Sequence, residues 1–186
     1  MTIRLVIAAL AALTLPACAL LEVEPDTASP FFAVPTGSVL EINQPLTIRA
    51  GSTRVWLQRG NVGAGRDWWH PACNLEINTL DRERDQIVAP GSFEVVRVQG
   101  AEEYTQLQAP MLAAASPVSL RTAFDDGGVT WMWLGHHLWL DSAEQPDVRR
   151  LTCFGVYSRP FEARPPSIDQ IREALGSAAT LHLPDQ

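Results

Sequence analysis

The chain contains no lysine, because all 14 of its basic residues are arginine. This absence excludes a phosphate-binding P-loop lysine, a Schiff-base lysine and a Ser-x-x-Lys acyl-enzyme. The Gly-x-Ser-x-Gly and His-Glu-x-x-His motifs are also absent. A catalytic triad scattered along the chain stays open as an alternative, because such triads are defined by geometry and not by spacing. We therefore expect a protein that is not an enzyme and that binds no cofactor.

Positive charge is scarce as well. Against 14 basic residues the chain has 21 acidic ones, which gives a formal net charge of −7. An acidic domain repels the phosphates of nucleic acids, so the composition predicts that nucleic acid is not a partner. No polybasic segment is present that would hold the chain on anionic lipid.

Long apolar runs are rare, and the longest lies at the amino end. Residues 5–15 form an apolar run behind Met1-Thr-Ile-Arg4, and this run is shorter than the roughly 20 residues that a spanning helix needs. A short positive segment followed by such a run is typical of a signal peptide. We therefore predict export, and no segment of the sequence is predicted to span a membrane.

The chain has three cysteines, and the first follows the apolar run directly. Leu15-Pro16-Ala17-Cys18 resembles the lipobox of bacterial lipoproteins, which predicts a signal peptide over residues 1–17 and acylation of Cys18. Several acyl chains hold a protein stably on a membrane. Residues 18–36 would then form a tether and residues 37–186 a single β-rich domain. Ala19, where an Asp would favour the inner membrane, favours the outer membrane and a periplasm-facing domain. The alternative is an ordinary secretory signal cut after Ala19.

Cys73 and Cys153 are the two remaining cysteines. An even pair in an oxidising compartment predicts a disulfide bond. Two alternatives stay open: a pair of free buried thiols, or a metal site in which His70 and Cys73, three positions apart, are both ligands.

Short β-branched or alternating runs separated by turn residues dominate the rest of the chain. They predict strands at residues 39–42, 46–49, 54–58, 73–79, 86–88, 93–98, 129–134, 137–140, 148–157 and 180–183. One helix is predicted from residue 168, with Ser167 as N-cap, Gln170 completing a capping box and Gly176 as the stop. The glycine-rich residues 60–65 are expected to be a flexible connection. The predicted fold is mainly β, an antiparallel β-sandwich or partly closed barrel with one C-terminal helix.

Histidines and acidic pairs give weak signals for a chemical site. His70 and His136 are weak candidates for metal ligands, and His136 and His137 are expected on opposite faces of a strand. The alternative is that these histidines are exposed or hydrogen-bonded in the fold. Asp125-Asp126 before two glycines suggests paired carboxylates, and it is also a common turn sequence.

Trp68 and Trp69 are adjacent in a predicted loop. If exposed, they would form a surface for an envelope protein or a glycan; the alternative is that they stack around the Cys73 bridge. Trp131 and Trp133 share one face of a predicted strand and are expected in the core.

Four segments together give a resemblance to a known group. They are His70-Pro-Ala-Cys-Asn-Leu-Glu-Ile77, Ile87-Val-Ala-Pro-Gly-Ser-Phe93, Glu144-Gln-Pro-Asp-Val-Arg-Arg-Leu-Thr-Cys153 and Ile168-Asp-Gln-Ile-Arg-Glu-Ala-Leu-Gly176. These segments resemble uncharacterised proteobacterial envelope lipoproteins over most of the mature domain. The resemblance implies a location and a domain extent, and it implies no activity.

Two hypotheses follow from the sequence. The first is a membrane-anchored envelope lipoprotein whose β domain is a non-catalytic binding or structural module, with the membrane and an envelope protein or glycan as partners. The second is a periplasmic metal- or small-ligand-binding protein that uses His70 and nearby residues.

Overall fold

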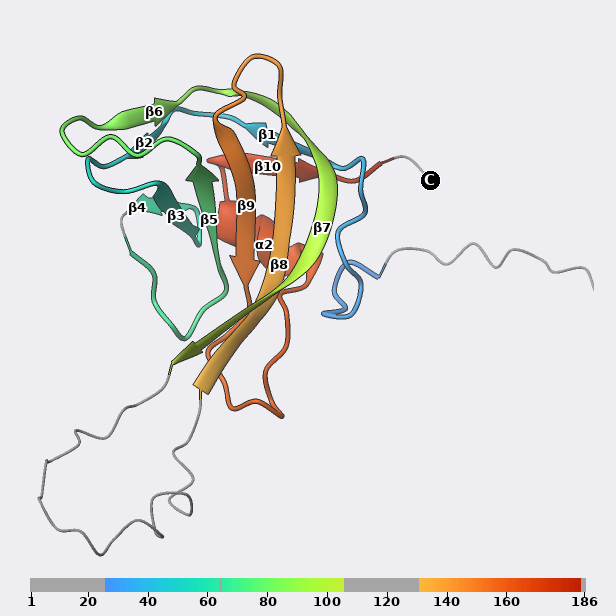
Figure 1. The fold of residues 1–186 in the computed structure, drawn as a ribbon. Coiled ribbons are helices and arrows are strands. Elements are labelled where there is room, and N and C mark those ends of the chain that lie inside the picture. Colours follow the sequence, from blue (N-terminus) through green and yellow to red (C-terminus); the bar gives the residue numbers. More distant parts are fainter. Residues whose placement is uncertain (1–25, 64, 106–130, 185–186) are drawn as a thin grey trace, which may run out of the picture.

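A computed structural model describes residues 26–63, 65–105 and 131–184 of the chain (Figure 1). In these residues ten strands and one helix follow the chain. Their bounds are β1 (Val39–Ile42), β2 (Leu46–Ile48), β3 (Arg54–Gln58), β4 (Asn61–Gly63), β5 (Ala72–Ile77), β6 (Gln86–Val88), β7 (Gly91–Thr105), β8 (Trp131–Asp141), β9 (Val148–Phe154), α2 (Ile168–Leu175) and β10 (Ala179–His182). No helix in this part of the chain is long and apolar enough to cross a membrane.

Eight strands form one antiparallel sheet, in the order β10-β1-β7-β8-β9-β5-β3-β4. The sheet curls into half a barrel, and β2 and β6 pair separately as a small second sheet. Figure 1 shows α2 behind β8 and β9, on the concave side of the curl. The predicted fold class is therefore confirmed, and of its two forms the structure has the partly closed barrel.

Helix α2 joins the two ends of the open sheet. It contacts β3 and β5 on one side and β10 on the other. Its capping box is formed as predicted, because the Ser167 side chain accepts from the backbone N–H of Gln170 and the Gln170 side chain accepts from the Ser167 N–H. The predicted stop at Gly176 is also present, and a Cβ there would lie 2.3 Å from Gly60 Cα. Glycine at residue 176 therefore allows the end of the helix to touch the β3–β4 turn.

The main core lies between the helix and the concave face of the sheet. Cys73 and Cys153 are directly opposite one another on β5 and β9, with Cα atoms 4.0 Å apart, and they form a disulfide bond. Both are buried in this core. The predicted disulfide is confirmed, and neither sulfur atom is free to bind a metal.

Two predicted boundaries are wrong. The glycine-rich residues 60–65 were expected to form a loop, but residues 61–63 are β4 and pair with β3. The strands predicted on either side of Gly135 are one strand, β8, in which a Cβ at Gly135 would lie 2.1 Å from the carbonyl oxygen of Cys153. The glycine here allows two strands to approach closely and does not end one.

The amino-terminal segment of the described chain packs onto the domain. Val34 is buried in the main core and Phe32 packs against that core. The Thr27 carbonyl accepts a hydrogen bond of 3.1 Å from the backbone N–H of Asp169, in the first turn of α2. Residues 27–34 therefore contribute to the domain's packing.

Candidate functional site

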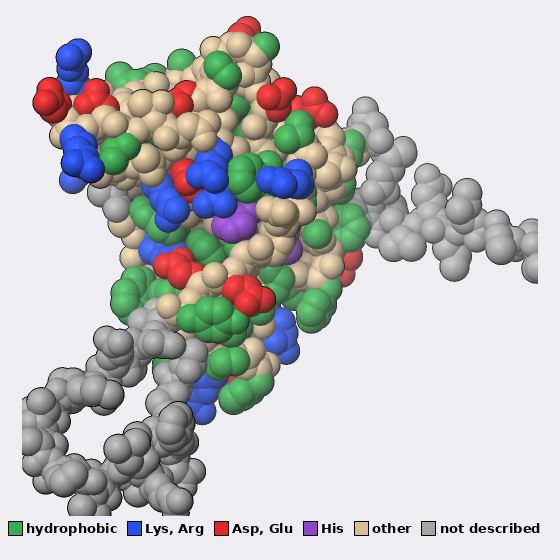
Figure 2. All heavy atoms as spheres, in the orientation of Figure 1, with side chains coloured by type: hydrophobic (Ala, Val, Ile, Leu, Met, Phe, Trp, Pro, Cys, Tyr) green, Lys and Arg blue, Asp and Glu red, His purple; other side chains and the backbone are tan. Residues whose placement is uncertain are grey.

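The convex face of the sheet carries an ordered row of charged side chains. The register aligns one residue from each of five neighbouring strands across this face, in the order Arg97, Trp139, Arg150, Glu76 and Arg54. We call this set, together with Arg149, the arginine row. Figure 2 shows basic side chains gathered at the middle of this face, beside a histidine.

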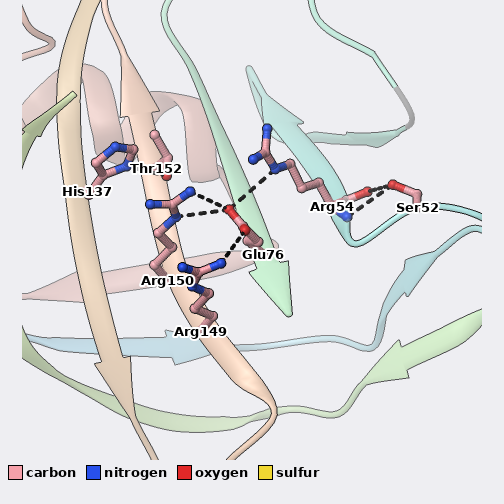
Figure 3. A network of polar contacts seen from close by, with 7 residues as sticks. All are labelled: Ser52, Arg54, Glu76, His137, Arg149, Arg150 and Thr152. Atoms are coloured by element: carbon pink, nitrogen blue, oxygen red, sulfur yellow. Dashed lines mark hydrogen bonds and ion pairs between the residues drawn. The ribbon is translucent and has the colours of Figure 1, made fainter. Parts of the chain in front are cut away.

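Glu76 lies at the centre of the arginine row and is almost fully buried. Its side chain is 7% exposed, and three guanidinium groups surround it (Figure 3). Arg150 binds it at 2.8 Å, Arg149 at 3.1 Å and Arg54 at 3.3 Å. Charge-assisted hydrogen bonds of this kind fix the positions of the guanidinium groups.

Trp139 lies in the row on the opposite side of Arg150 from Glu76, and it contacts three arginines. The guanidinium carbon of Arg97 lies 4.2 Å from the centre of its indole ring, and those of Arg149 and Arg150 lie 5.2 and 5.3 Å away. Such distances are typical of cation–π contacts. The indole N–H donates to the side-chain oxygen of Gln99 at 2.8 Å, so the ring itself is held in place.

Two β-bulges bring arginines to this face. The β5–β9 register passes from Glu76↔Arg150 to Ile77↔Val148, so Arg149 is an extra residue and faces Glu76 together with its neighbour. A bulge leaves the extra residue outside the ladder and reverses the alternation beyond it. The same occurs on β7, where Val96 is the extra residue and Arg97 comes to lie beside Trp139.

A neutral polar row lies next to the arginine row. Its members are Gln99, His137, Thr152 and Asn74 on successive strands. His137 Nδ1 and Thr152 Oγ1 are hydrogen-bonded at 2.9 Å. Burial, followed by the positive charge of Arg150, lowers the pKa of His137 below its ordinary value, and Glu76 opposes the effect. The imidazole is therefore held in its neutral form beside the arginines.

An aromatic cluster forms the far end of the same face. Ala101, Trp133, Phe154 and Tyr157 are buried together, with Trp56 and Trp131 packed against them. The Arg66 guanidinium, on a side chain that is 8% exposed, lies 4.4 Å from the Trp56 ring and 4.0 Å from the Trp133 ring, and binds Glu103 at 3.1 Å. Burial lowers the pKa of Arg66, while Glu103 opposes the effect. These contacts of Arg66 hold the β4–β5 loop against the sheet.

Trp68 and Trp69 rest on this aromatic cluster. Trp68 meets Trp133 edge to face at 5.5 Å, and Trp69 meets Trp131 edge to face at 5.9 Å. The expectation that the pair stacks around the Cys73 bridge is wrong, because the disulfide lies in the core on the other face of the sheet. Both indoles stay about half exposed, at 48% and 59%. Trp133 is buried as predicted, and Trp131 is only partly buried.

The structure does not bring the candidate metal ligands together. His70 Nε2 lies 3.8 Å from Asp67 on the surface, and its neighbour in sequence, Cys73, is in the disulfide. His136 Nε2 is buried without a hydrogen-bond partner in the structure, and burial lowers the pKa of this residue. In the described residues no three His, Cys, Asp or Glu side chains are grouped so as to hold a metal ion.

A hollow borders the arginine row at Arg54. It has a volume of about 510 Å³ and is formed by residues of β2, β3 and β4, of the β2–β3 connection, and of the segments just before β2 and β6. Its lining includes Arg49, Arg54, Ser52 and Asp85. The Asp85 side chain accepts a hydrogen bond from the backbone N–H of Ala50. Arg54 therefore stands between this hollow and Glu76.

Other predicted positions lie outside the described residues. These are the signal peptide 1–17, the acylation site Cys18, and the acidic pair Asp125 and Asp126. The arginine row itself was missed by the sequence interpretation. The sequence feature that could have indicated it was a pair of adjacent arginines, Arg149-Arg150, inside a predicted strand.

The fold and the site together define a half-barrel β domain whose convex face combines an arginine row with an aromatic cluster. The chain was compared with protein-family models, with curated proteins and with solved structures, and no match was found in any of them.

Proposed function

We propose that this protein is a lipid-anchored binding module of the bacterial cell envelope, and that the convex face of its sheet is the binding surface. The observation that carries the binding role is the arginine row. Three guanidinium groups share one carboxylate, Glu76, and a fourth, that of Arg97, lies over the Trp139 ring, on a chain with a net charge of −7. An excess of positive charge concentrated on one face of an acidic protein favours a negatively charged partner.

The anchoring role is proposed from the sequence. Leu15-Pro16-Ala17-Cys18 supplies the acylation site, and the buried Cys73–Cys153 bond supports folding outside the reducing cytosol. Ala19 supports transfer to the outer membrane, with the domain facing the periplasm.

Mass spectrometry of the protein from bacterial membranes tests the anchor. Because the chain has no lysine, trypsin would release residues 18–49 as its first mature peptide. We expect this peptide to start at Cys18 and to carry acyl chains, and we expect Cys18→Ala to leave the protein unacylated. A peptide that starts at Leu20 without lipid would instead identify an ordinary secretory signal and refute the anchor.

Photo-crosslinking tests the binding role. A probe placed at Gln99, beside the arginine row, should capture a specific envelope component from intact cells. The matched control is the same probe at Ser177, an exposed residue beyond the end of α2. Equal products from both positions, or no product from either, would argue against a binding surface on the convex face. We make no proposal for a metal at His70, because no observation in the structure favours it.

A further inference from the structure

The arginine row contains more positive charge than its own carboxylate can balance. Arg54, Arg149 and Arg150 all bind Glu76, and one carboxylate neutralises only one of them. Arg97 adds a fourth guanidinium group, and among the described residues it forms no ion pair within 4.0 Å. The row therefore holds an excess of three positive charges, and its arginines lie on the alternate strands β7, β9 and β3.

The guanidinium groups are also fixed before any ligand arrives. Glu76 binds those of Arg54, Arg149 and Arg150. The centre of the Trp139 ring lies 4.2–5.3 Å from those of Arg97, Arg149 and Arg150. An arginine carries five N–H donors, and Glu76 engages only one or two on each of its partners. The remaining donors are available in a fixed arrangement, which reduces the entropy lost on binding.

The two bulges show that the fold brings arginines to this face at the expense of regular pairing. Without the bulge on β9, Arg149 would point into the core; without the bulge on β7, Arg97 would do so. A purely structural salt bridge to Glu76 would need neither of them, because Arg150 and Arg54 already reach it. Bulges that redirect a side chain are over-represented beside functional sites.

The surroundings of the row limit the size of the ligand group. On one side lie the uncharged donors and acceptors of Gln99, His137 and Thr152. On the other side the next pair of β7 and β8 residues on this face is Glu94 and Asp141, because Val95 and Leu140 between them and the row point into the core. The carboxylates of Glu94 and Asp141 would repel a ligand that extended over them. The cationic surface is therefore narrow along the strands. Its compact part is formed by Arg97, Arg149 and Arg150, whose guanidinium carbons lie 4.2–5.3 Å from the centre of the Trp139 ring, and this part matches one compact anionic group instead of a long polyanion.

From these observations we propose that the arginine row binds the dianionic phosphoryl group of a phosphate monoester. The proposal rests on the binding role of the convex face given above, and it names the ligand chemistry. Guanidinium groups form paired N–H···O bonds with phosphate oxygens. A dianion balances the excess charge better than a single carboxylate does, and the neutral side chains of Gln99 and His137 can hydrogen-bond the rest of the headgroup.

The test uses the full-length protein in micelles of an uncharged detergent. Glycerol 1-phosphate is titrated in while the imidazole resonances of His137 are followed by NMR. We expect saturable shifts and a raised pKa for His137, because a bound anion stabilises the imidazolium form. A second titration uses short-chain dihexanoyl phosphatidic acid, with dihexanoyl phosphatidylcholine, a zwitterionic phosphodiester of zero net charge, as its control. Binding of glycerol 1-phosphate assigns a free phosphate ligand, and binding of the phosphatidic acid alone assigns a lipid headgroup.

Matched variants separate the site from general electrostatics. Arg97→Gln/Arg149→Gln should weaken binding at least tenfold, whereas Arg82→Gln/Arg84→Gln removes the same charge from an exposed loop and should change it less than twofold. If the first variant does not fold, the exposed Arg97→Gln alone should still weaken binding severalfold. Equal weakening by both double variants, or no saturable binding of either phosphate probe, would overturn the proposal. The mass of the residue 18–49 peptide from the same preparation reports on the anchor independently.

Discussion

At the scale of single residues, glycine positions decide how closely neighbouring strands approach. Gly135 lies in the middle of β8 where β9 crosses it, and a Cβ there would lie 2.1 Å from the Cys153 carbonyl oxygen. Gly100, opposite His136 in the neighbouring strand, has no atom within 4 Å of its hypothetical Cβ. The two residues therefore differ in packing, although both are glycines inside long strands.

We expect Gly135→Ala to lower the free energy of unfolding by about 2–3 kcal/mol, because β8 and β9 must separate to admit the methyl group. Gly100→Ala is the matched control and should change the stability by less than about 0.5 kcal/mol. Urea denaturation of both variants, followed by tryptophan fluorescence, measures the difference. Similar stabilities for the two would contradict the close approach at Gly135.

The partly buried imidazole of His136, whose Nε2 is fully buried, predicts how stability depends on pH. Burial lowers its pKa below the ordinary value of 6.5, so the unfolded chain takes up this proton at a higher pH than the folded protein does. The free energy of unfolding should therefore fall as the pH drops below about 6.5 and should be unaffected by this group above that pH. His136→Leu should reduce the loss of stability between pH 7 and pH 5, measured by urea denaturation at both. The control is His70→Leu, at an imidazole that is about half exposed on the surface. An undiminished loss in His136→Leu would refute the assignment.

At the scale of elements, helix α2 closes the half barrel. Its apolar side buries Ile168, Ile171 and Leu175 against the concave face, and the Ala174 carbonyl accepts a hydrogen bond of 3.2 Å from Gly60 in the β3–β4 turn. With only eight residues the helix is too short to be stable alone in water, so these contacts maintain it. The local sequence sets where it begins and ends, and the sheet provides most of its stability.

Ser167→Ala should lower the free energy of unfolding by about 1 kcal/mol, because the backbone N–H of Gln170 loses its acceptor at a partly buried helix end. Ser177→Ala, at an exposed serine just beyond the helix, is the matched control. Thermal denaturation by circular dichroism compares the two. An unchanged midpoint for Ser167→Ala would show that the capping box contributes no stability.

At the scale of the whole molecule, the disulfide joins parts of the chain that are 80 residues apart. It links β5 to β9 at the centre of the sheet and lies in the core beneath the helix. The residues just opposite, on the convex face, are those of the polar and arginine rows, because side chains alternate along each strand. The bond therefore fixes the two strands that supply Glu76, Arg149 and Arg150 to the proposed site.

Replacing both cysteines, as Cys73→Ala/Cys153→Ala, should lower the free energy of unfolding by about 2–5 kcal/mol, because the unfolded chain is no longer constrained by this long loop. Denaturant unfolding of the variant and of the wild type measures the loss. The wild type unfolded in the presence of a reducing agent should match the variant closely. A variant as stable as the oxidised wild type would contradict a stabilising role for the bond.

The sequence by itself determined the local features of this domain. Alternating apolar residues predicted most strands, and Ser167 and Gln170 predicted the start of α2. Two cysteines besides Cys18, in a chain predicted to be exported, predicted the disulfide bond. The strand and helix signals come from residues close together in the chain. The disulfide could be predicted because Cys73 and Cys153 are the only two cysteines left if Cys18 is acylated. The partly closed barrel was one of two forms that this pattern allowed.

Only the tertiary structure decided the arrangement of the candidate site. Arg54, Glu76, Arg97 and Arg150 belong to four strands, and the pairing register that aligns them depends on contacts made across the whole sheet. The two bulges change the face to which Arg97 and Arg149 point, and a regular alternation read from the sequence assigns such residues to the wrong side. Charges that are isolated along the chain become a single row because a β-sheet places distant residues about 5 Å apart on neighbouring strands.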